Sequence, residues 1–282
     1  MNFPYDRARQ LVKLALEEDI ASGDVSALWT IPSERVSEAE LRSKAEGVLA
    51  GMPFIEIVCE EVDSSIKVEL FYQDGQTVQN GDVIAKLKGP SQSLLGAERT
   101  FLNFLQHLSG VATQTQQYVN QISSESSTQI LDTRKTLPGF RLLQKYAVAM
   151  GGGTNHRIGL YDMVMLKENH IEAAGGIALA LEKVFDQKPH DMKVEVEVEN
   201  LDQITEALEY PIHQIMLDNM DNELTREAVA LIRAKSVDVK IEASGNMTLE
   251  RIHSVSLTGV DYISVGALTH SVTAFDISLR FV

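Results

Sequence analysis

The feature that most constrains the fold is a repeated pattern in the second half of the chain, where short apolar runs alternate with longer helical patterns. Each run has the length of a buried strand, and each intervening segment has the spacing of an amphipathic helix. Six such runs lie at residues 129–131, 163–166, 194–198, 214–217, 239–243 and 262–265. Helices are expected between them at residues 140–150, 176–185, 201–208, 222–234 and 248–256. This alternation predicts a parallel β/α architecture.

The ends of the six runs carry charged, glycine or hydroxyl-bearing residues. These are Asp132 to Lys135, Lys167, Glu197, Asp218, Ser244 to Asn246 and Gly266. A closed β/α barrel builds its active site from the carboxyl ends of its strands, whereas an open doubly wound sheet uses one crevice at a switch point. Because every run ends in this way, we predict a barrel. Six units fall short of eight, so we expect an incomplete barrel of six to seven strands.

The first half of the chain has a different pattern, which indicates a smaller α+β domain. An amphipathic helix is expected at residues 5–17. A β-rich segment is expected at residues 36–88, with turns at Asp74-Gly75 and Asn80-Gly81. Residues 75–89 have the outline of a biotinyl- or lipoyl-type hairpin. No lysine occupies the tight turn where such a group is attached, so a plain hairpin is favoured.

A long helix at residues 93–119, with Gly110 as a candidate break, is expected to lead into the barrel. We therefore predict an N-terminal α+β, sandwich-like domain at residues 1–112 and a β/α-barrel domain at residues 113–270. The last segment, 271–282, is expected to pack back on the N-terminal domain.

The charge and the cysteine content exclude several classes of function. With 25 Lys and Arg against 40 Asp and Glu, the net charge is −15, which argues against nonspecific binding to nucleic acid. Cys59 is the only cysteine, so neither an intrachain disulfide nor a cysteine-based zinc cluster can form. No stretch approaches the ~18 apolar residues of a membrane span. A cytoplasmic protein is the expectation.

Positive charge is nevertheless concentrated in residues 131–171, which contain only three acidic residues. Its basic side chains are Arg134, Lys135, Arg141, Lys145, His156, Arg157, Lys167 and His170. A guanidinium matches a planar carboxylate with two N–H donors, whereas an ammonium is a compact charge suited to phosphate. Any one of these bases alone is best interpreted as solvated surface. Their joint placement in an acidic protein favours a site for anions instead.

Several motifs in this region and beyond it resemble one known family. In chain order they are DTRKT-x-PG, KYAV-x-x-GGG-x-NHR-x-GL, LKENH, EVEVEN, LDN, ASGN and ISVGALTHS. Together they resemble quinolinate phosphoribosyltransferase, also called nicotinate-nucleotide pyrophosphorylase (carboxylating). The resemblance extends from Glu98-Arg99-Thr100 to the C-terminal region, with weaker agreement at residues 18–24. It therefore covers nearly the whole chain.

The resemblance implies phosphoribosyl transfer from phosphoribosyl pyrophosphate (PRPP) to quinolinate with decarboxylation, in NAD biosynthesis. The positions it assigns to the quinolinate carboxylates are Thr133, Arg134, His156, Arg157 and Lys167. Lys135 is implied near the reacting groups. Glu197 and Asp218 are implied to face the ribose hydroxyls and the Mg²⁺ of PRPP. The positions it assigns to the 5′-phosphate are Ser244, Gly245, Asn246, Val265, Gly266 and Ala267.

The resemblance also implies a homodimer in which Arg99 reaches the site of the neighbouring subunit, and leaves open whether dimers form hexamers. Related transferases that use nicotinate, or that accompany molybdenum transport, are the nearest alternatives. A non-catalytic binding module is a further one. For Glu195 and Glu199, flanking Glu197, a solvated strand face is an equally good interpretation, because alternation alone predicts carboxylates at every second position.

Overall fold

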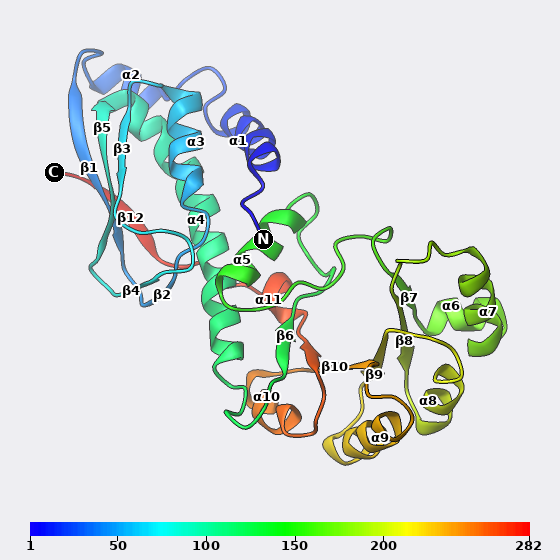
Figure 1. The fold of residues 1–282 in the computed structure, drawn as a ribbon. Helices are drawn as coiled ribbons and strands as arrows, with labels where there is room; N and C mark the ends of the chain where they lie inside the picture. The colour runs from blue at the N-terminus through cyan, green and yellow to red at the C-terminus, as the bar shows by residue number, and fades with distance from the viewer. The chain divides into compact units, whose positions relative to one another are not determined.

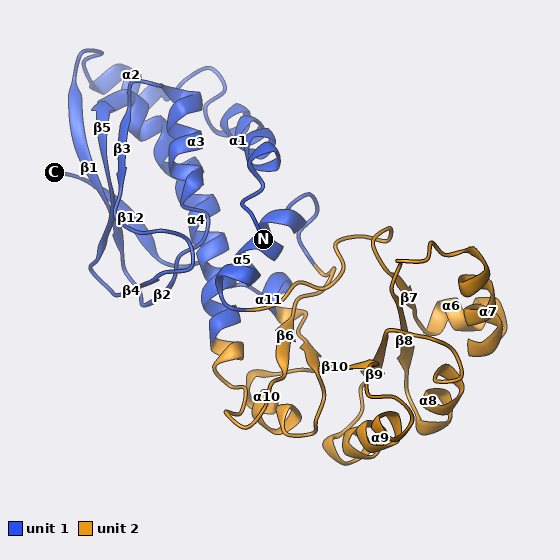
Figure 2. Ribbon diagram, viewed as in Figure 1, with its two compact units in different colours: residues 1–116, 136–152, 268–282 blue, residues 117–135, 153–267 orange.

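A computed structural model describes all residues from Met1 to Val282, and the chain divides into two compact units. Unit 1 contains residues 1–116, 136–152 and 268–282. Unit 2 contains residues 117–135 and 153–267 (Figure 2). Each unit is built from segments that are distant in sequence. None of the helices combines the length and the apolarity that crossing a lipid bilayer requires.

Unit 1 consists of a four-stranded antiparallel sheet, a two-stranded ribbon and several helices (Figure 1). Its strands are β1 (Val36–Ser43), β2 (Gly47–Val48), β3 (Lys67–Leu70), β4 (Thr77–Val78), β5 (Val83–Pro90) and β12 (Ile277–Phe281). Its helices are α1 (Tyr5–Asp19), α2 (Val25–Thr30), α3 (Pro53–Val62), α4 (Ser91–Val119) and α5 (Arg141–Met150), with most of α11 (Ala267–His270). The sheet order is β12-β1-β5-β3, so the last strand of the chain pairs with the first.

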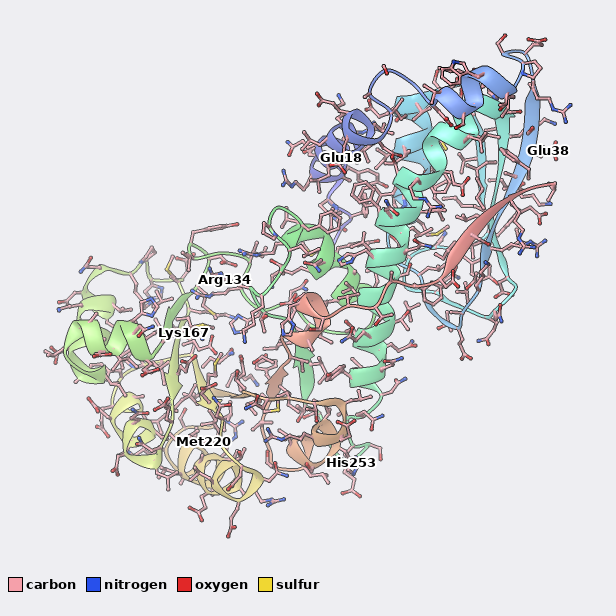
Figure 3. The ribbon with its side chains drawn as sticks, turned by 180° about the vertical axis from the view of Figure 1, so that it is seen from behind. Glu18, Glu38, Arg134, Lys167, Met220 and His253 are labelled. Atoms are coloured by element: carbon pink, nitrogen blue, oxygen red, sulfur yellow. The ribbon has the colours of Figure 1, made fainter.

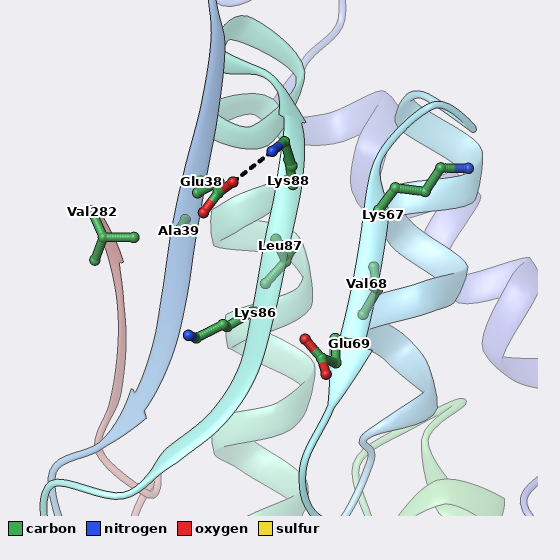
Figure 4. A pocket seen from close by; sticks show the side chains of 9 residues that line it. All are labelled: Glu38, Ala39, Lys67, Val68, Glu69, Lys86, Leu87, Lys88 and Val282. Atoms are coloured by element: carbon green, nitrogen blue, oxygen red, sulfur yellow. Dashed lines mark hydrogen bonds and ion pairs between the residues drawn. The ribbon is translucent and has the colours of Figure 1, made fainter.

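The sheet of unit 1 separates an apolar face from a charged one. Leu87, between Lys86 and Lys88 on β5, is buried, and the two lysines point to the opposite face (Figure 4). There Lys88 forms an ion pair with Glu38 at 2.6 Å beside a shallow cavity of about 260 Å³. Successive side chains on a strand alternate between faces, so this arrangement follows from the sequence. None of the expected site residues lines this cavity.

The segment at residues 36–88 is β-rich as expected, with β1 to β5, but Pro53–Val62 within it forms the helix α3, which was not predicted. Phe54, Ile57 and Val58 lie at the i, i+3 and i+4 spacing of one helix face and are buried. Pro53 at the first helical position supplies a fixed φ and loses no hydrogen bond there. The short apolar run was therefore helical and not a strand.

The expectation that Gly110 breaks the long helix is also wrong, because α4 is helical from Ser91 to Val119. Instead, the absence of a side chain at Gly110 lets another backbone segment lie close to α4. A Cβ at Gly110 would lie 2.3 Å from the carbonyl oxygen of Thr273. Gly151, at the end of α5, is similar: a Cβ there would lie 2.2 Å from the carbonyl oxygen of Ala112. Both glycines let neighbouring backbone segments pack directly against α4.

Unit 2 confirms the predicted incomplete β/α barrel. Its strands are β6 (Gln129–Leu131), β7 (Val164–Leu166), β8 (Val194–Val198), β9 (Gln214–Asp218), β10 (Lys240–Ser244) and β11 (Tyr262–Ser264). Its helices are α6 (Glu168–Ala174), α7 (Ile177–Gln187), α8 (Leu201–Ala207), α9 (Asn222–Lys235) and α10 (Leu249–Ser256). The sheet order is β6-β11-β10-β9-β8-β7 and every pairing is parallel. The sheet is open between β6 and β7, and Thr154 forms a single parallel bridge to Leu131 at the open edge of β6.

Replacement of Gly110 by alanine is expected to lower the free energy of unfolding by about 1 to 3 kcal/mol, because the new methyl group overlaps a carbonyl oxygen. Gly96 on the same helix provides the matched control, since a Cβ there would have its nearest neighbour, Ile20 Cδ1, at 3.7 Å. Gly96→Ala should stabilise by up to about 1 kcal/mol through helix propensity. Urea unfolding followed by circular dichroism measures both. Equal effects of the two substitutions would contradict this account.

Candidate active site

The carboxyl end of β6 is tied to the loop at residues 153–157 by one buried carboxylate. Asp132 Oδ1 accepts a hydrogen bond from the backbone N–H of His156 at 2.8 Å, and Oδ2 accepts from Asn155 Nδ2 at 2.7 Å. Asp132 itself is fully buried. Thr133 Oγ1 accepts the backbone N–H of Lys135 at 3.0 Å, which turns the chain directly after the strand. This turn and the loop bring Arg134, His156 and Arg157 into one region of unit 2.

Arg134 and Arg157 lie close enough for their charges to interact. Burial, and then the positive charge of Arg134, lower the pKa of Arg157, while the negative charges of Glu195 and Asp162 act in the opposite sense. Arg157 is only 9% exposed and donates from Nη1 to the carbonyl oxygen of Met163 at 3.0 Å. Two guanidinium groups held near each other repel, and an anion between them would relieve that repulsion.

His156 lies above two fully buried carboxylates inside the barrel. Its Nε2 is 3.1 Å from Glu195 Oε2 and 3.2 Å from Glu242 Oε2. Burial lowers the pKa of His156, but its hydrogen bonds to Glu195 and Glu242 outweigh this and raise the pKa to about 10. The backbone N–H of Arg157 donates to Nδ1 at 2.7 Å, which opposes a second ring proton. Nε2 is therefore the ring nitrogen whose proton faces the two carboxylates.

The two carboxylates are also bridged to each other. Gln214 Nε2 donates to Glu195 Oε1 at 3.1 Å and to Glu242 Oε2 at 2.5 Å. Burial, and then the negative charge of Glu242, raise the pKa of Glu195 to about 7. A solvated strand face, the alternative interpretation for Glu195, is thus wrong because its side chain is 0% exposed. Glu199, which follows the end of β8, is exposed.

Lys167 and Glu197 form an ion pair at the carboxyl ends of β7 and β8. Their side chains are 43% and 14% exposed, respectively. Lys167 is also the residue that caps α6, and its backbone N–H donates to His170 Nδ1 at 3.2 Å. The half-exposed ammonium of Lys167, on its flexible stem, can turn from the carboxylate toward an incoming anion.

The loops after β9 and β10 meet in left-handed backbone conformations. Asn219, Gly245 and Asn246 have φ values of 55°, 91° and 49°. A Cβ at Gly245 would lie 2.1 Å from Asn219 Oδ1, so only glycine fits. Asn219 donates from Nδ2 to Asp218 Oδ2 at 2.7 Å and accepts from Asn246 Nδ2 at 3.2 Å.

The carbonyl groups of this second loop are directed toward Arg251. Arg251 Nη1 donates to the carbonyl oxygens of Gly245 and Asn246 at 3.3 and 3.1 Å. In a trans peptide the N–H points opposite to the C=O, so the N–H groups of Asn246 and Met247 are directed away from Arg251. The loop therefore presents backbone donors, which is the arrangement expected of a phosphate site.

The remaining site candidates are placed as follows. Lys135 is exposed in the turn after β6. Val265 follows β11, and its N–H donates to the carbonyl oxygen of Leu131 at 2.9 Å. Gly266 and Ala267 follow it directly. Arg99 lies in unit 1 on α4, with a side chain that is 59% exposed and its Nη2 4.0 Å from Glu98 Oε1. Figure 3 marks Arg134 after β6 and Lys167 after β7 in unit 2.

A cavity of about 560 Å³ opens at the other end of the barrel, where the strands begin. Lys193, Gln214 and Tyr262, at the amino ends of β8, β9 and β11, line it together with His156 and Arg157. The charged candidates at the carboxyl ends, such as Glu197 and Asp218, do not line it. The loop at residues 153–163 therefore borders both this cavity and the basic residues after β6.

Three residues of this site were not identified from the sequence. Glu242 and Gln214 were missed because their inward direction depends on strand register, which pairs Glu195 with Gln214 and Glu242 with Met216. Asp132 was noted at the end of the first apolar run and in the DTRKT motif, but without a role of its own. The available signal was the acidic residue inside two of the apolar runs, Glu195 on β8 and Glu242 on β10, since a charge within an apolar run is seldom buried without a partner.

The fold and the site together define a class of protein: a β/α-barrel enzyme with guanidinium groups and a left-handed loop at the carboxyl ends of its strands. Comparison with known proteins gives the family. The model of the quinolinate phosphoribosyl transferase N-terminal domain matches residues 24–109, and that of the C-terminal domain matches residues 111–280. The chain belongs to the quinolinate phosphoribosyl transferase family.

Individual relatives agree over nearly the whole chain. Quinolinate phosphoribosyltransferase [decarboxylating] 2b, mitochondrial, of Nicotiana tabacum is 44% identical over 96% of this chain and 81% of its own length. The probable nicotinate-nucleotide pyrophosphorylase [carboxylating] of Bacillus subtilis is 44% identical over 93% of this chain and 89% of its own. The solved structure of the nicotinate-nucleotide pyrophosphorylase from Francisella tularensis matches with a TM-score of 0.94 and 44% identity, covering 100% of this chain and 98% of that one.

Gly245→Ala is expected to raise the Michaelis constant for PRPP by about tenfold or more, because the loop must move away from Asn219 and the N–H groups lose their direction. Gly176 is the matched control: its φ is 131° but a Cβ there would meet no atom within 4 Å. Both variants should lose about 1 to 2 kcal/mol of stability from backbone strain. Steady-state kinetics and thermal unfolding separate the effects. An unchanged constant in Gly245→Ala would count against the phosphate loop.

Proposed function

We propose that this chain transfers the phosphoribosyl group of PRPP to quinolinate and decarboxylates the product, giving nicotinate mononucleotide, pyrophosphate and CO₂ in NAD biosynthesis. The observation that carries the proposal is the cluster of Arg134, Arg157 and Lys167 in a chain whose net charge is −15. Membership of the quinolinate phosphoribosyl transferase family supports it. A dianionic pyridine is the ligand that such a cluster selects, because both of its carboxylates find guanidinium or ammonium partners.

Quinolinate is proposed to bind at the loop end of the barrel against Thr133, Arg134, Arg157 and Lys167. His156, which the resemblance also assigns to the carboxylates, has both ring nitrogens engaged within the protein, so its role there is proposed to be indirect. The guanidinium groups hold the carboxylates, and this orients the ring nitrogen toward C1 of the phosphoribosyl group. The loop from Ser244 to Asn246 and the residues Gly266 and Ala267 hold the 5′-phosphate through backbone N–H groups. The N–H of Val265, which the resemblance also assigns to the phosphate, already donates to Leu131. Fixing two reactants in one geometry supplies on the order of several kcal/mol of barrier lowering.

The reaction then proceeds in two stages. In the first, the bond between C1 and the pyrophosphate oxygen breaks, the bonding electrons leave with pyrophosphate near Lys135, and the ring nitrogen forms the new bond to C1. Positive charge that develops on the ribose is offset by Glu197 and Asp218. In the second, the bond from ring carbon 2 to its carboxylate breaks and CO₂ leaves. The quaternised nitrogen stabilises the resulting carbanion, which takes a proton, so no organic cofactor is required.

The donor set at the ends of β8 and β9 fits Mg²⁺. Glu197 and Asp218 offer carboxylate oxygens, which are the hard ligands that this ion takes alongside substrate phosphates. We propose that these two residues hold the ion with PRPP, directly or through water. Mg²⁺ would supply charge neutralisation to the pyrophosphate group.

The assembly is proposed to be a homodimer with a shared active site. Arg99 is exposed on α4 in unit 1, and a guanidinium there is available to a neighbouring copy. The cytoplasmic location expected from the sequence stays a prediction, and plant relatives carry mitochondrial or chloroplastic in their names.

The alternatives differ in the charge they require. Nicotinate has a single carboxylate, which leaves one of the two neighbouring guanidinium groups without a counter-charge. The molybdenum-linked relative departs from the Asn155-His156-Arg157 and Lys167-Glu168-Asn169-His170 patterns that this chain carries. A non-catalytic module has no need of Glu197 and Asp218 beside a basic cluster.

The direct test is release of CO₂ from carboxyl-labelled quinolinate. We expect release only when PRPP and Mg²⁺ are present, and none from either substrate alone. Arg134→Ala and Lys167→Ala should lower kcat/KM by about a hundredfold or more, because each removes a charge-assisted contact of about 3 kcal/mol. Arg226→Ala and Lys183→Ala, on the exposed faces of α9 and α7, are the matched controls and should retain activity. Wild-type turnover in the first two variants would end this assignment.

The shared site has its own test. Arg99→Ala and Lys135→Ala are each expected to abolish most activity, because one removes the donated guanidinium and the other removes the ammonium near pyrophosphate. Mixing the two variants under conditions that exchange subunits should restore roughly a quarter of the sites, since half of the dimers are hybrids and each hybrid has one intact site. Activity of the mixture is followed together with hybrid formation by native mass spectrometry. Hybrids without activity would show that each subunit works alone.

A further inference from the structure

The interior of the barrel below the proposed quinolinate site contains a polar cluster made of His156, Glu195, Gln214 and Glu242. The side chains of Glu195 and Glu242 are 0% exposed and that of His156 is 6% exposed. Glu195 and Glu197 are alternate residues of β8, so their side chains share the inner face about 7 Å apart along the strand. The cluster is therefore a separate layer from the carboxylates proposed to face the ribose.

Both nitrogens of the His156 ring already have partners within the protein. Nε2 faces Glu195 at 3.1 Å and Glu242 at 3.2 Å. Nδ1 accepts the backbone N–H of Arg157 at 2.7 Å. Both ring nitrogens are directed into the protein, and a ring held in this way contributes to ligand binding by fixing its neighbours.

The neighbour that His156 fixes is Arg157. The peptide between the two residues is held by Asp132 on the N–H of His156 and by the His156 ring on the N–H of Arg157. From this point the Arg157 guanidinium reaches the carbonyl oxygen of Met163 at 3.0 Å. A chain of contacts thus runs from the buried carboxylates through His156 to a guanidinium of the basic cluster.

Retention of two carboxylates in the barrel core requires an explanation. Burial of like charges so close together is costly, and well-packed apolar residues of the same volume are often neutral or stabilising replacements. Neighbouring charges partly stabilise the cluster. Arg157 interacts with Glu195, and also with Arg134. Asp132 and Asp162 lie on the loop side of the cluster. A purely structural role would not require carboxylates at both positions.

We propose that Glu195 and Glu242 are positioning residues for quinolinate capture, which act through His156 to set the direction of the Arg157 guanidinium. The inference rests on the proposed function, because quinolinate is the ligand whose carboxylate Arg157 receives. Gln214 completes the arrangement by donating to both carboxylates, which keeps their oxygens turned toward His156.

The test uses the isosteric variants Glu195→Gln and Glu242→Gln in the full-length protein. An amide in either position places an N–H group against the His156 Nε2–H or against Gln214, so the ring must turn. We expect the Michaelis constant for quinolinate to rise by roughly tenfold to a hundredfold, while that for PRPP stays within about twofold. In a His156→Asn background the same substitutions should have little further effect on quinolinate, because residues that act through one another are not additive.

Asp261→Asn is the matched control. Asp261 lies in the same unit and pairs with Arg233 at 2.5 Å and Lys240 at 3.1 Å, outside the cluster. This variant should lose stability with both Michaelis constants unchanged. The proposal is overturned if the two constants rise together in the glutamate variants, or if the effects are undiminished in the His156→Asn background. It is also overturned if quinolinate binding is lost on chelation and returns with Zn²⁺, which would make the three residues a metal site.

Failure of this proposal is distinguishable from failure of the proposed function. The wild-type protein is measured first, and absence of PRPP-dependent CO₂ release there would reject the function itself. With wild-type activity in hand, glutamate variants that bind quinolinate as tightly as the wild type would reject only the positioning role.

Discussion

The structure depends on keeping positively charged side chains close together when no ligand is bound between them. Two guanidinium groups, of Arg134 and Arg157, lie close together at one end of a barrel, and their mutual repulsion works against the fold in the absence of nearby negative charge. The chain places that negative charge on both sides. Asp132 holds the loop, Asp162 receives the backbone N–H groups of Ile158 and Gly159, and Glu195 and Glu242 lie beneath. The proposed substrate would add two further negative charges beside the guanidinium groups.

The open edge of the barrel is what makes this arrangement possible. Between β6 and β7 the sheet lacks a neighbouring strand, and the loop at residues 153–163 enters there and pairs with β6 only at Thr154. A complete strand would direct alternate side chains inward and outward with a fixed period. The loop instead directs the successive residues Asn155, His156 and Arg157 into the same interior. The incomplete barrel and the basic site are in this sense one feature.

Much of the fold was predictable because the spacing of apolar residues along the chain indicates where strands and helices form. The six apolar runs of the second half correspond to β6 to β11, since buried parallel strands are continuous apolar segments. Predictions failed where a short pattern had two solutions. Pro53–Val62 has an apolar run that suits a strand or a helix, and Gly110 serves a close approach to Thr273 instead of a helix break. Both the helix at Pro53–Val62 and the packing at Gly110 depend on contacts with residues distant in sequence.

The charged candidates of the site were identified by residue type and position, whereas their interactions were not. Arg134, Arg157 and Lys167 stand out as bases in an acidic chain, but the ion pair of Lys167 with Glu197 requires two strands in register. Glu242 and Gln214 were missed for the same reason. The most direct test of the account is a crystal structure with quinolinate bound. We predict carboxylate oxygens about 3 Å from the guanidinium groups of Arg134 and Arg157; quinolinate bound away from both would contradict the account.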